Sequence, residues 1–457
     1  MMSQFIKQLK PPNRPAEIGR AFAECLAEIK TGPWKFIQLR GETFAAENLT
    51  DDDVDLLGTR ESVNVLLKTC FEWVRAGRCH IRIRSRKENK IEFTLFSLDG
   101  RQSALFDLWM TLPQLDRGRS SLTYEACQSA VIDANESIQR LPLDIEASVY
   151  VQHLICKKKN LNTPTVQHRL TTYFQRFLES RNVELRDVVS SILLNETVSP
   201  TAEQISLQYL KRNLNTSHLK RNQQQTSTII AKLQTAGIGT PRHSSMVTMI
   251  GCDGAGKTTL AHELKKHDTK IGRIKTGKHF YRKSLSYKLA VIFIRPLLFQ
   301  DRERFDEILA PFVYLRACLG LRLMLLFSSK NSSTLIDRSL IDFLYVDRKT
   351  DAPRFSKFHW LRNLFGVRIP NVHCIASHET VMKRKQEVTK QGHFRYDEDM
   401  FQEFALRCPT DAVLFNNDGE LDASRIAMQR ILSKSGVCTV SNDMPEHVAQ
   451  HNNRNAA

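Results

Sequence analysis

A glycine-rich segment at residues 251–259 carries the side chains of this chain best suited to bind phosphate. It reads Gly-Cys-Asp-Gly-Ala-Gly-Lys-Thr-Thr and fits the pattern G-x-x-x-x-G-K-[ST] at every fixed position. The largely apolar run 245–250 precedes it, as expected of a buried strand, and residues 260–266 follow with helical spacing. A strand, a glycine loop and a helix N-terminus in this order direct backbone N–H groups at one anion. The segment therefore predicts a polyphosphate site.

Each side chain of the loop has an expected role. The glycines let the backbone curl around phosphate oxygens, because no Cβ blocks the turn. Lys257 is expected to reach the β- and γ-phosphates, Thr258 to hold Mg²⁺ through its hydroxyl, and Thr259 to contact the α-phosphate region. The predicted cofactors are ATP and Mg²⁺. The predicted nucleotide-binding residues are Gly251, Asp253, Gly254, Ala255, Gly256, Lys257, Thr258 and Thr259.

A second pair of candidate residues closes another apolar run. Residues 334–336 (Thr-Leu-Ile) predict a buried strand that ends in Asp337-Arg338. Ligands of open α/β sheets sit at the carboxyl ends of strands. Asp337 is placed to orient Mg²⁺-bound water or to accept a proton from the acceptor, and Arg338 to clamp the acceptor or the transferring phosphoryl group. The alternative is a surface salt bridge at the end of a strand.

Residues 245–435 resemble the thymidylate kinase-like P-loop kinases. The marks are the Asp-Gly inside the glycine loop, Asp337-Arg338, and a basic segment, 381–385, after a predicted strand at 372–376. The resemblance implies phosphoryl transfer from ATP under a mobile lid, whose arginines close over the phosphates and exclude water. Arg384 and Arg395 are the lid candidates, although each is equally explained as a solvated charge on a helix. The predicted catalytic residues are Lys257, Asp337, Arg338, Arg384 and Arg395.

The acceptor side departs from that family. Residues 277–283 (Gly-Lys-His-Phe-Tyr-Arg-Lys) stand where the family carries an arginine-containing acceptor signature, and they show no recognisable thymidylate pocket. The resemblance therefore implies the donor side and the reaction type, with a small nucleotide or sugar as acceptor. Two apolar stretches with arginines, 289–299 and 312–327, favour a membrane-surface or lipid-linked acceptor, unless they are core helices of the kinase-like domain.

Residues 30–115 resemble the small nucleotidyltransferase fold. Leu39-Arg40-Gly41-Glu42 is followed, after a spacer, by Asp53-Val54-Asp55. Alternate residues of a strand face the same side, so the two aspartates are placed to bind Mg²⁺ together. The resemblance implies a third carboxylate from a neighbouring strand, for which Asp107 fits best and Glu92 is the alternative. Such a site can transfer nucleotidyl groups with two metal ions. The departure is Glu42, an anion where the family has Gly or Ser, which favours a domain that only binds or scaffolds.

Length and charge limit the remaining possibilities. A chain of 457 residues predicts two or three domains. The net charge of +17 favours an anionic partner, but it predicts no specific nucleic acid. Ten scattered cysteines without metal-binding spacing indicate reduced thiols, and no signal peptide is recognisable at the N-terminus, so we expect a cytoplasmic protein, peripheral at a membrane if the acceptor is lipid-linked.

The expected fold is α/β, with a doubly wound parallel sheet in the C-terminal half and an α+β nucleotidyltransferase-like domain before it. The predicted order is that α+β domain at 15–120, a helical region at 121–212, a linker at 213–244, the P-loop kinase-like domain at 245–435 and a flexible tail at 436–457. Three functions follow: a small-molecule kinase, a bifunctional enzyme that also transfers nucleotidyl groups, or a nucleotide-binding scaffold without kinase activity.

Overall fold

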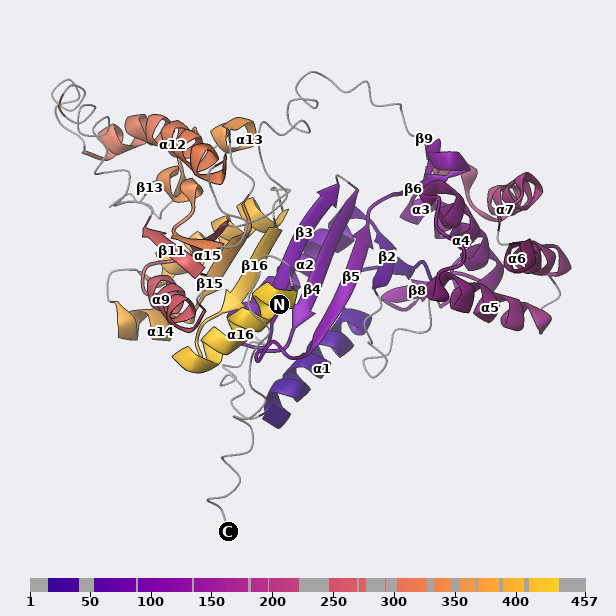
Figure 1. Cartoon of the computed structure of the whole chain (residues 1–457), viewed down its shortest axis with the longest axis horizontal. Helices are drawn as coiled ribbons and strands as arrows, with labels where there is room; N and C mark the ends of the chain where they lie inside the picture. Colours follow the sequence, from indigo (N-terminus) through magenta and orange to yellow (C-terminus); the bar gives the residue numbers. More distant parts are fainter. Residues whose placement is uncertain are drawn as a thin grey trace, which may run out of the picture.

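One sheet of eleven strands runs through the described part of the chain (Figure 1). The computed structural model describes residues 15–40, 53–87, 89–133, 135–179, 182–195, 197–221, 246–268, 271–276, 292, 302–326, 333–346, 354–358, 360–365, 369–385, 389–406 and 411–434. The sheet's C-terminal half consists of β10 (Met246–Ile250), β11 (Ile271–Thr276), β12 (Ser333–Asp337), β15 (Asn371–Ile375) and β16 (Asp411–Asn416). Its N-terminal half consists of β1 (Phe36–Gln38), β2 (Val54–Gly58), β3 (His80–Lys87), β4 (Lys90–Phe96), β5 (Ser103–Trp109) and β8 (Ile138–Arg140). The spatial order is β11-β12-β10-β15-β16-β3-β4-β5-β2-β1-β8.

The C-terminal half of the sheet is parallel and covered on both faces. Every neighbouring pair from β11 to β16 is parallel. Buried residues of α9 (Lys257–His267) and α16 (Leu421–Lys434) pack on one face of these strands. On the other face pack residues of α12 (Arg302–Leu326), α13 (Leu361–Phe365) and α15 (Lys390–Phe401). The expected α/β class is confirmed, and fully buried strands such as β10 explain why the sequence runs there are apolar without alternation.

The N-terminal half is mixed. Helices α1 (Pro15–Thr31) and α2 (Arg60–Arg75) pack on one face of β3, β4 and β5. Strand β2 pairs in parallel with β5, which places Asp55 opposite Asp107. Helix α2 follows β2 directly and is capped by Thr59, whose side chain accepts from the backbone N–H of Ser62. We did not predict this helix from the sequence.

The helical region packs beside the N-terminal half. Four helices share one buried cluster: α4 (Leu143–Lys157), α5 (Pro164–Leu178), α6 (Val183–Asn195) and α7 (Pro200–Asn213). The remaining elements are short: β6 (Leu112–Leu115), η3 (Asp116–Gly118), β7 (Ser120–Leu122), α3 (Tyr124–Cys127), η4 (Thr216–His218), β9 (Lys220–Arg221), η7 (Leu340–Phe343), β13 (Tyr345–Val346), β14 (Arg354–Phe355), α14 (His378–Arg384) and η8 (Gln402–Leu406).

Strands β16 and β3 join the two halves into one sheet. They pair antiparallel, with Val413 opposite Arg82. Arg82 donates to both carboxylate oxygens of Asp411, at 2.7 and 2.5 Å. Phe71 of α2 stacks on Phe401 of α15, with ring centroids 4.4 Å apart. The predicted N-terminal and kinase-like domains therefore share both a sheet and a core, while the boundaries between them stay a prediction.

Several predicted features lie wholly or mostly outside the described residues. They are the acceptor segment 277–283, the stretch 289–299, most of the linker and the tail 436–457. The stretch 312–327 lies almost entirely in α12, which buries Tyr314 and Leu321 but leaves Phe312 64% exposed and Leu319 60% exposed. None of the described helices is long and apolar enough to cross a bilayer. A membrane-surface acceptor stays a prediction.

The ion pair between Arg82 and Asp411 gives a stability test of the joined sheet. Arg82→Ala leaves the Asp411 carboxylate, whose side chain is only 14% exposed, without its partner, so we expect a loss of about 3 kcal/mol in unfolding free energy. Removing both charges with Arg82→Met and Asp411→Leu should cost clearly less. Urea unfolding measures both, with Arg20→Ala at an exposed ion pair as the control. Equal losses in the single and double variants would contradict the role of this pair.

Candidate functional site

The glycine loop after β10 is shaped by backbone conformations that favour glycine. Gly251 and Gly256 have φ values of 145° and 81°. A Cβ at Gly251 would lie 2.3 Å from the carbonyl oxygen of Cys374, and one at Gly256 would lie 2.6 Å from Nδ2 of Asn417. Larger residues at either position would push the loop away from the strands that hold it.

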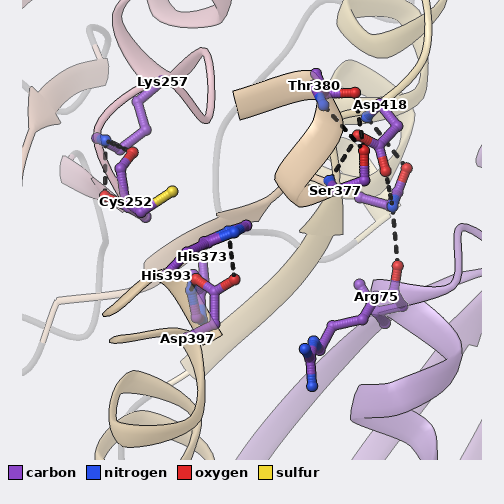
Figure 2. Close-up of polar contacts among 12 residues, drawn as sticks. Arg75, Cys252, Lys257, His373, Ser377, Thr380, His393, Asp397 and Asp418 are labelled. Carbon is purple, nitrogen blue, oxygen red and sulfur yellow. Dashed lines mark hydrogen bonds and ion pairs between the residues drawn. The ribbon is translucent and has the colours of Figure 1, made fainter. Parts of the chain in front are cut away.

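Helix α9 begins at this loop with free donors. Gly256 is its N-cap residue, and no described side chain caps the helix start. The first backbone N–H groups of a helix have no partner within the helix, so they face the space in front of the loop. Lys257 is buried and folds back, donating from Nζ to the carbonyls of Gly251 and Cys252 at 2.7 Å each (Figure 2). These two contacts hold the ammonium at the loop.

Asp337 lies beside the start of α9, as its place at a strand end predicts. Parallel pairing of β10 and β12 puts Met249 opposite Asp337. The hydroxyl of Thr258 donates to Oδ2 of Asp337. The other oxygen, Oδ1, is buried without a hydrogen-bond partner among the described residues. A hydroxyl and a carboxylate with a spare oxygen are ligands that suit Mg²⁺, so these two residues fit the predicted ion.

Arg338, the residue after Asp337, contacts the glycine loop through Asp253. Its φ of 85° is unusual for a residue with a side chain, and such strain occurs often at functional sites. Its guanidinium pairs with Asp253, and Nζ of Lys385 lies 3.5 Å from the same carboxylate. Burial raises the pKa of Asp253, but Arg338, Lys257 and Lys385 outweigh it, so the net pKa is below the ordinary value. Asp253 therefore holds these cations at the mouth of the loop.

These groups face one cavity of about 440 Å³, within the range of small-molecule sites. Of the two predicted lid arginines, Arg384 is among the described residues that line this cavity, and Arg395 is not. Arg395 instead borders a separate hollow along α15 and lies 4.0 Å from Asp399. Of the two lid candidates, the structure brings only Arg384 to the loop. The described residues that line the cavity are Asp253, Gly254, Gly256, Lys257, Thr258, Thr259, Asp337, Arg338, Arg384 and Lys385.

Sequence reasoning missed two features beside the loop. Asn417 donates from Nδ2 to the carbonyl of Ala255 at 2.8 Å. Behind the loop, His373 and His393 each place Nε2 3.1 Å from a different oxygen of Asp397 (Figure 2). Burial alone would raise the pKa of Asp397. The two histidines lower this pKa by more than burial raises it, so the pKa of Asp397 is below the ordinary value. The sequence signal that could have indicated these residues is a polar residue within or directly after an apolar run, such as His373 in 372–376.

The N-terminal carboxylates gather as predicted. Asp53, Asp55 and Asp107 offer ligand oxygens that lie within 4.8 Å of one another. Asp107 joins this group and Glu92, the alternative, does not. Asp55 and Asp107 are both buried and stand opposite each other on paired strands. Their assignment as metal ligands stays a prediction.

The chain's own donors already occupy this carboxylate cluster. Oδ2 of Asp55 accepts from Arg40, and its Oδ1 accepts from Nε1 of Trp109 at 2.9 Å. Lys90 donates to Oδ2 of Asp107. The adjoining cavity measures about 20 Å³, room for about one water, whereas bound Mg²⁺ usually keeps several. In this arrangement, the carboxylate cluster has no room for a divalent cation together with a triphosphate.

Comparison with known proteins adds a weak similarity. A solved thymidylate kinase from Candida albicans is similar at 15% identity, over 45% of this chain and 97% of that chain, with a TM-score of 0.32. No protein-family model and no curated protein matches the chain. A similarity this low says nothing about activity, so a function has to be argued from the residues of the site.

The carboxyl of Asp107 gives a pH test. Burial raises its pKa to about 6, against the opposing effect of Lys90. Because an unfolded aspartate titrates near about 3.9, the folded chain holds a proton that the unfolded chain has lost between these two pH values. Stability due to Asp107 is therefore lost as pH rises from about 4 to about 6.

Urea unfolding at each pH, on wild type and Asp107→Asn, measures this effect. We expect the wild-type free energy of unfolding to fall relative to the variant across that window. Above it the difference should be constant, which serves as the internal control. A difference that grows in favour of wild type between pH 4 and 6 would show that the folded-state pKa is not raised.

Proposed function

We propose that this chain is an ATP- and Mg²⁺-dependent phosphotransferase that acts on a small acceptor. The observation that carries the proposal is the single cavity described above. It gathers a glycine loop, an uncapped helix start, Lys257, the Thr258–Asp337 pair and two arginines from separate elements. Backbone N–H groups and cations that surround a transferring phosphoryl group provide most of the catalysis in this chemistry.

The charge of the cavity suits a polyphosphate. Four cations line it, Lys257, Arg338, Arg384 and Lys385, against two carboxylates, Asp253 and Asp337. The excess of positive charge lies beside a helix N-terminus, whose partial charge has the same sign. A nucleoside triphosphate tail would therefore be attracted to this cavity more strongly than a neutral ligand of equal size.

The site residues have separable tasks. Lys257 would exchange its two carbonyl partners for phosphate oxygens, so its ammonium moves only a short way from loop to ligand. Thr258 and Asp337 would hold Mg²⁺, which when bound neutralises charge on the β- and γ-phosphates. Arg338 and Arg384, from different elements, would contact the transferring group or the acceptor from two sides.

The contact between Thr258 and Asp337 bears on a choice that the sequence left open. A carboxylate that accepts from the P-loop threonine lies where it can orient metal-bound water. That position favours the metal-orienting role for Asp337 over the role of proton acceptor. The predicted acceptor segment, 277–283, lies outside the described part of the chain, and nucleotides and sugars both stay candidates as the acceptor.

A turnover assay tests the proposal. Purified full-length chain is given ATP, Mg²⁺ and one member at a time of a panel of nucleoside monophosphates and sugars, and ADP release is measured. ADP release that depends on the acceptor supports the kinase. Nucleotide binding without such release supports the scaffold, and the absence of any ATP binding by calorimetry contradicts the site altogether.

Lys257→Ala should lower the rate of phosphoryl transfer by about 10²–10³-fold, because the ammonium that would face the transferring phosphoryl group is lost. The fold should survive, as measured by thermal unfolding. Lys266→Ala is the matched control, since that lysine lies on the same helix with its side chain 71% exposed. Near-normal turnover in the Lys257 variant would rule out the assignment.

Asp337→Asn should raise the Mg²⁺ concentration needed for half-maximal rate by roughly tenfold or more, since a ligating carboxylate becomes neutral. Affinity for metal-free ATP should change little. Thr258→Ala should raise the Mg²⁺ requirement as Asp337→Asn does. Thr258→Ser, which keeps the hydroxyl, should have a Mg²⁺ requirement near that of wild type. An unchanged Mg²⁺ dependence in Asp337→Asn would return this residue to the role of proton acceptor.

A further inference from the structure

A turn at residues 416–418 lies between the glycine loop and the N-terminal half of the sheet. It reads Asn-Asn-Asp: Asn416 is the last residue of β16, and Asn417 and Asp418 follow the strand. We refer to these three residues as the asparagine turn. Asn416 and Asn417 are 6% and 3% exposed, although both are polar. Buried polar side chains of this kind need partners, and the partners here lie in two distant parts of the chain.

One side of the turn holds the glycine loop. Nδ2 of Asn417 donates to the carbonyl of Ala255 at 2.8 Å, and the backbone N–H of Asn417 donates to the carbonyl of Ile375 at 2.7 Å. The carbonyl of Asn417 accepts from the guanidinium of Arg384 at 3.3 Å. The turn therefore supports both the loop backbone and one of the arginines that face the cavity.

The turn also supports α14, the helix that ends at Arg384. Oδ1 of Asp418 accepts from the backbone N–H of Ser377 at 2.7 Å, and Ser377 is the N-cap residue of α14. Figure 2 shows Asp418 beside Ser377 and Thr380 at the start of this helix. A shift of the turn would therefore move the loop and the arginine together.

The other side of the turn is held by the N-terminal half. The backbone N–H of Asn416 donates to Nδ1 of His80 at 3.1 Å, and Nδ2 of Asn416 donates to the carbonyl of Val74 at 2.9 Å. His80 begins β3 and Val74 lies near the end of α2. The ring of His80 also stacks on Phe415, with centroids 4.2 Å apart.

The partners of His80 fix its protonation state. A backbone N–H can only donate, so Nδ1 of His80 must carry a lone pair toward Asn416. Nε2 lies 2.9 Å from the carbonyl of Leu98, which can only accept, so Nε2 must carry the proton. Burial lowers the pKa of His80 to about 4, which keeps the ring neutral under ordinary conditions. The ring therefore presents one fixed acceptor to the turn.

We propose that His80 is a positioning residue of the nucleotide site. Its Nδ1 fixes Asn416, the next residue supports the carbonyl of Ala255, and the N-terminal half thereby helps to set the affinity for ATP. The inference rests on the proposed function, because it concerns the same glycine loop. It adds that the loop is shaped in part by a side chain more than 170 residues before it in the sequence.

Three variants at one position test this role by calorimetry with MgATP on the full chain. His80→Leu removes the acceptor and should weaken MgATP binding roughly three- to tenfold, the cost of about one hydrogen bond. His80→Asn keeps an acceptor near the place of Nδ1 and should recover most of the affinity. Phe93→Leu, in the N-terminal core at 0% exposure, is the control for general loosening and should bind MgATP as wild type does.

A double-mutant cycle with Asn417→Ala tests whether His80 affects the glycine loop through the asparagine turn. If His80 acts through the turn, His80→Leu should add little to the loss already caused by Asn417→Ala, because the two effects are not independent. Additive losses, or unchanged affinity in His80→Leu, would overturn the inference. Wild type that binds no MgATP would instead refute the proposed function, so the two failures are distinct.

Discussion

Parallel pairing of β10 with β12 is the constraint on which the candidate site depends. Because Met249 stands opposite Asp337, the glycine loop and the Asp-Arg pair leave the same edge of the sheet as neighbours. A slip of the register by one residue would reverse the faces of β12 and take Asp337 away from Thr258. The backbone N–H of Arg338 donates to the carbonyl of Met249 at 2.8 Å, which fixes this register at its end.

The same edge also depends on the sheet beyond it. Strand β15 lies beside β10, β16 beside β15, and β3 beside β16, so the loop's support continues into the N-terminal half without a break (Figure 1). The stacking of Phe71 on Phe401 and the ion pair of Arg82 with Asp411 add two further contacts across this junction. A junction with a shared core and a continuous backbone ladder leaves little freedom for the two halves to move as separate bodies.

Local patterns predicted the parts of the site that lie close together in the sequence. The loop at 251–259 and Asp337-Arg338 were readable because apolar runs end directly before them. The gathering of Asp53, Asp55 and Asp107 matches the expectation from strand alternation and from the resemblance, which implied a third carboxylate on a neighbouring strand. The contact from Asn416 to His80 spans 336 residues, and no local pattern encodes a pairing at that separation. Arg395 borders a different hollow from that at the glycine loop. The sequence did not predict this, because it does not reveal which side of its helix a basic residue faces.

Asp337 and the Asp53–Asp55–Asp107 cluster differ in what surrounds them. Asp337 keeps a buried oxygen without a partner among the described residues and lies at a cavity of about 440 Å³. Asp55 has both oxygens occupied by Arg40 and Trp109 and lies at a cavity of about 20 Å³. The guanidinium of Arg40 pairs with the buried Asp55 carboxylate, and the adjoining cavity of about 20 Å³ is too small for a phosphate. Among the described residues, this contrast supports the proposal of a nucleotide site at the glycine loop rather than at the N-terminal carboxylates.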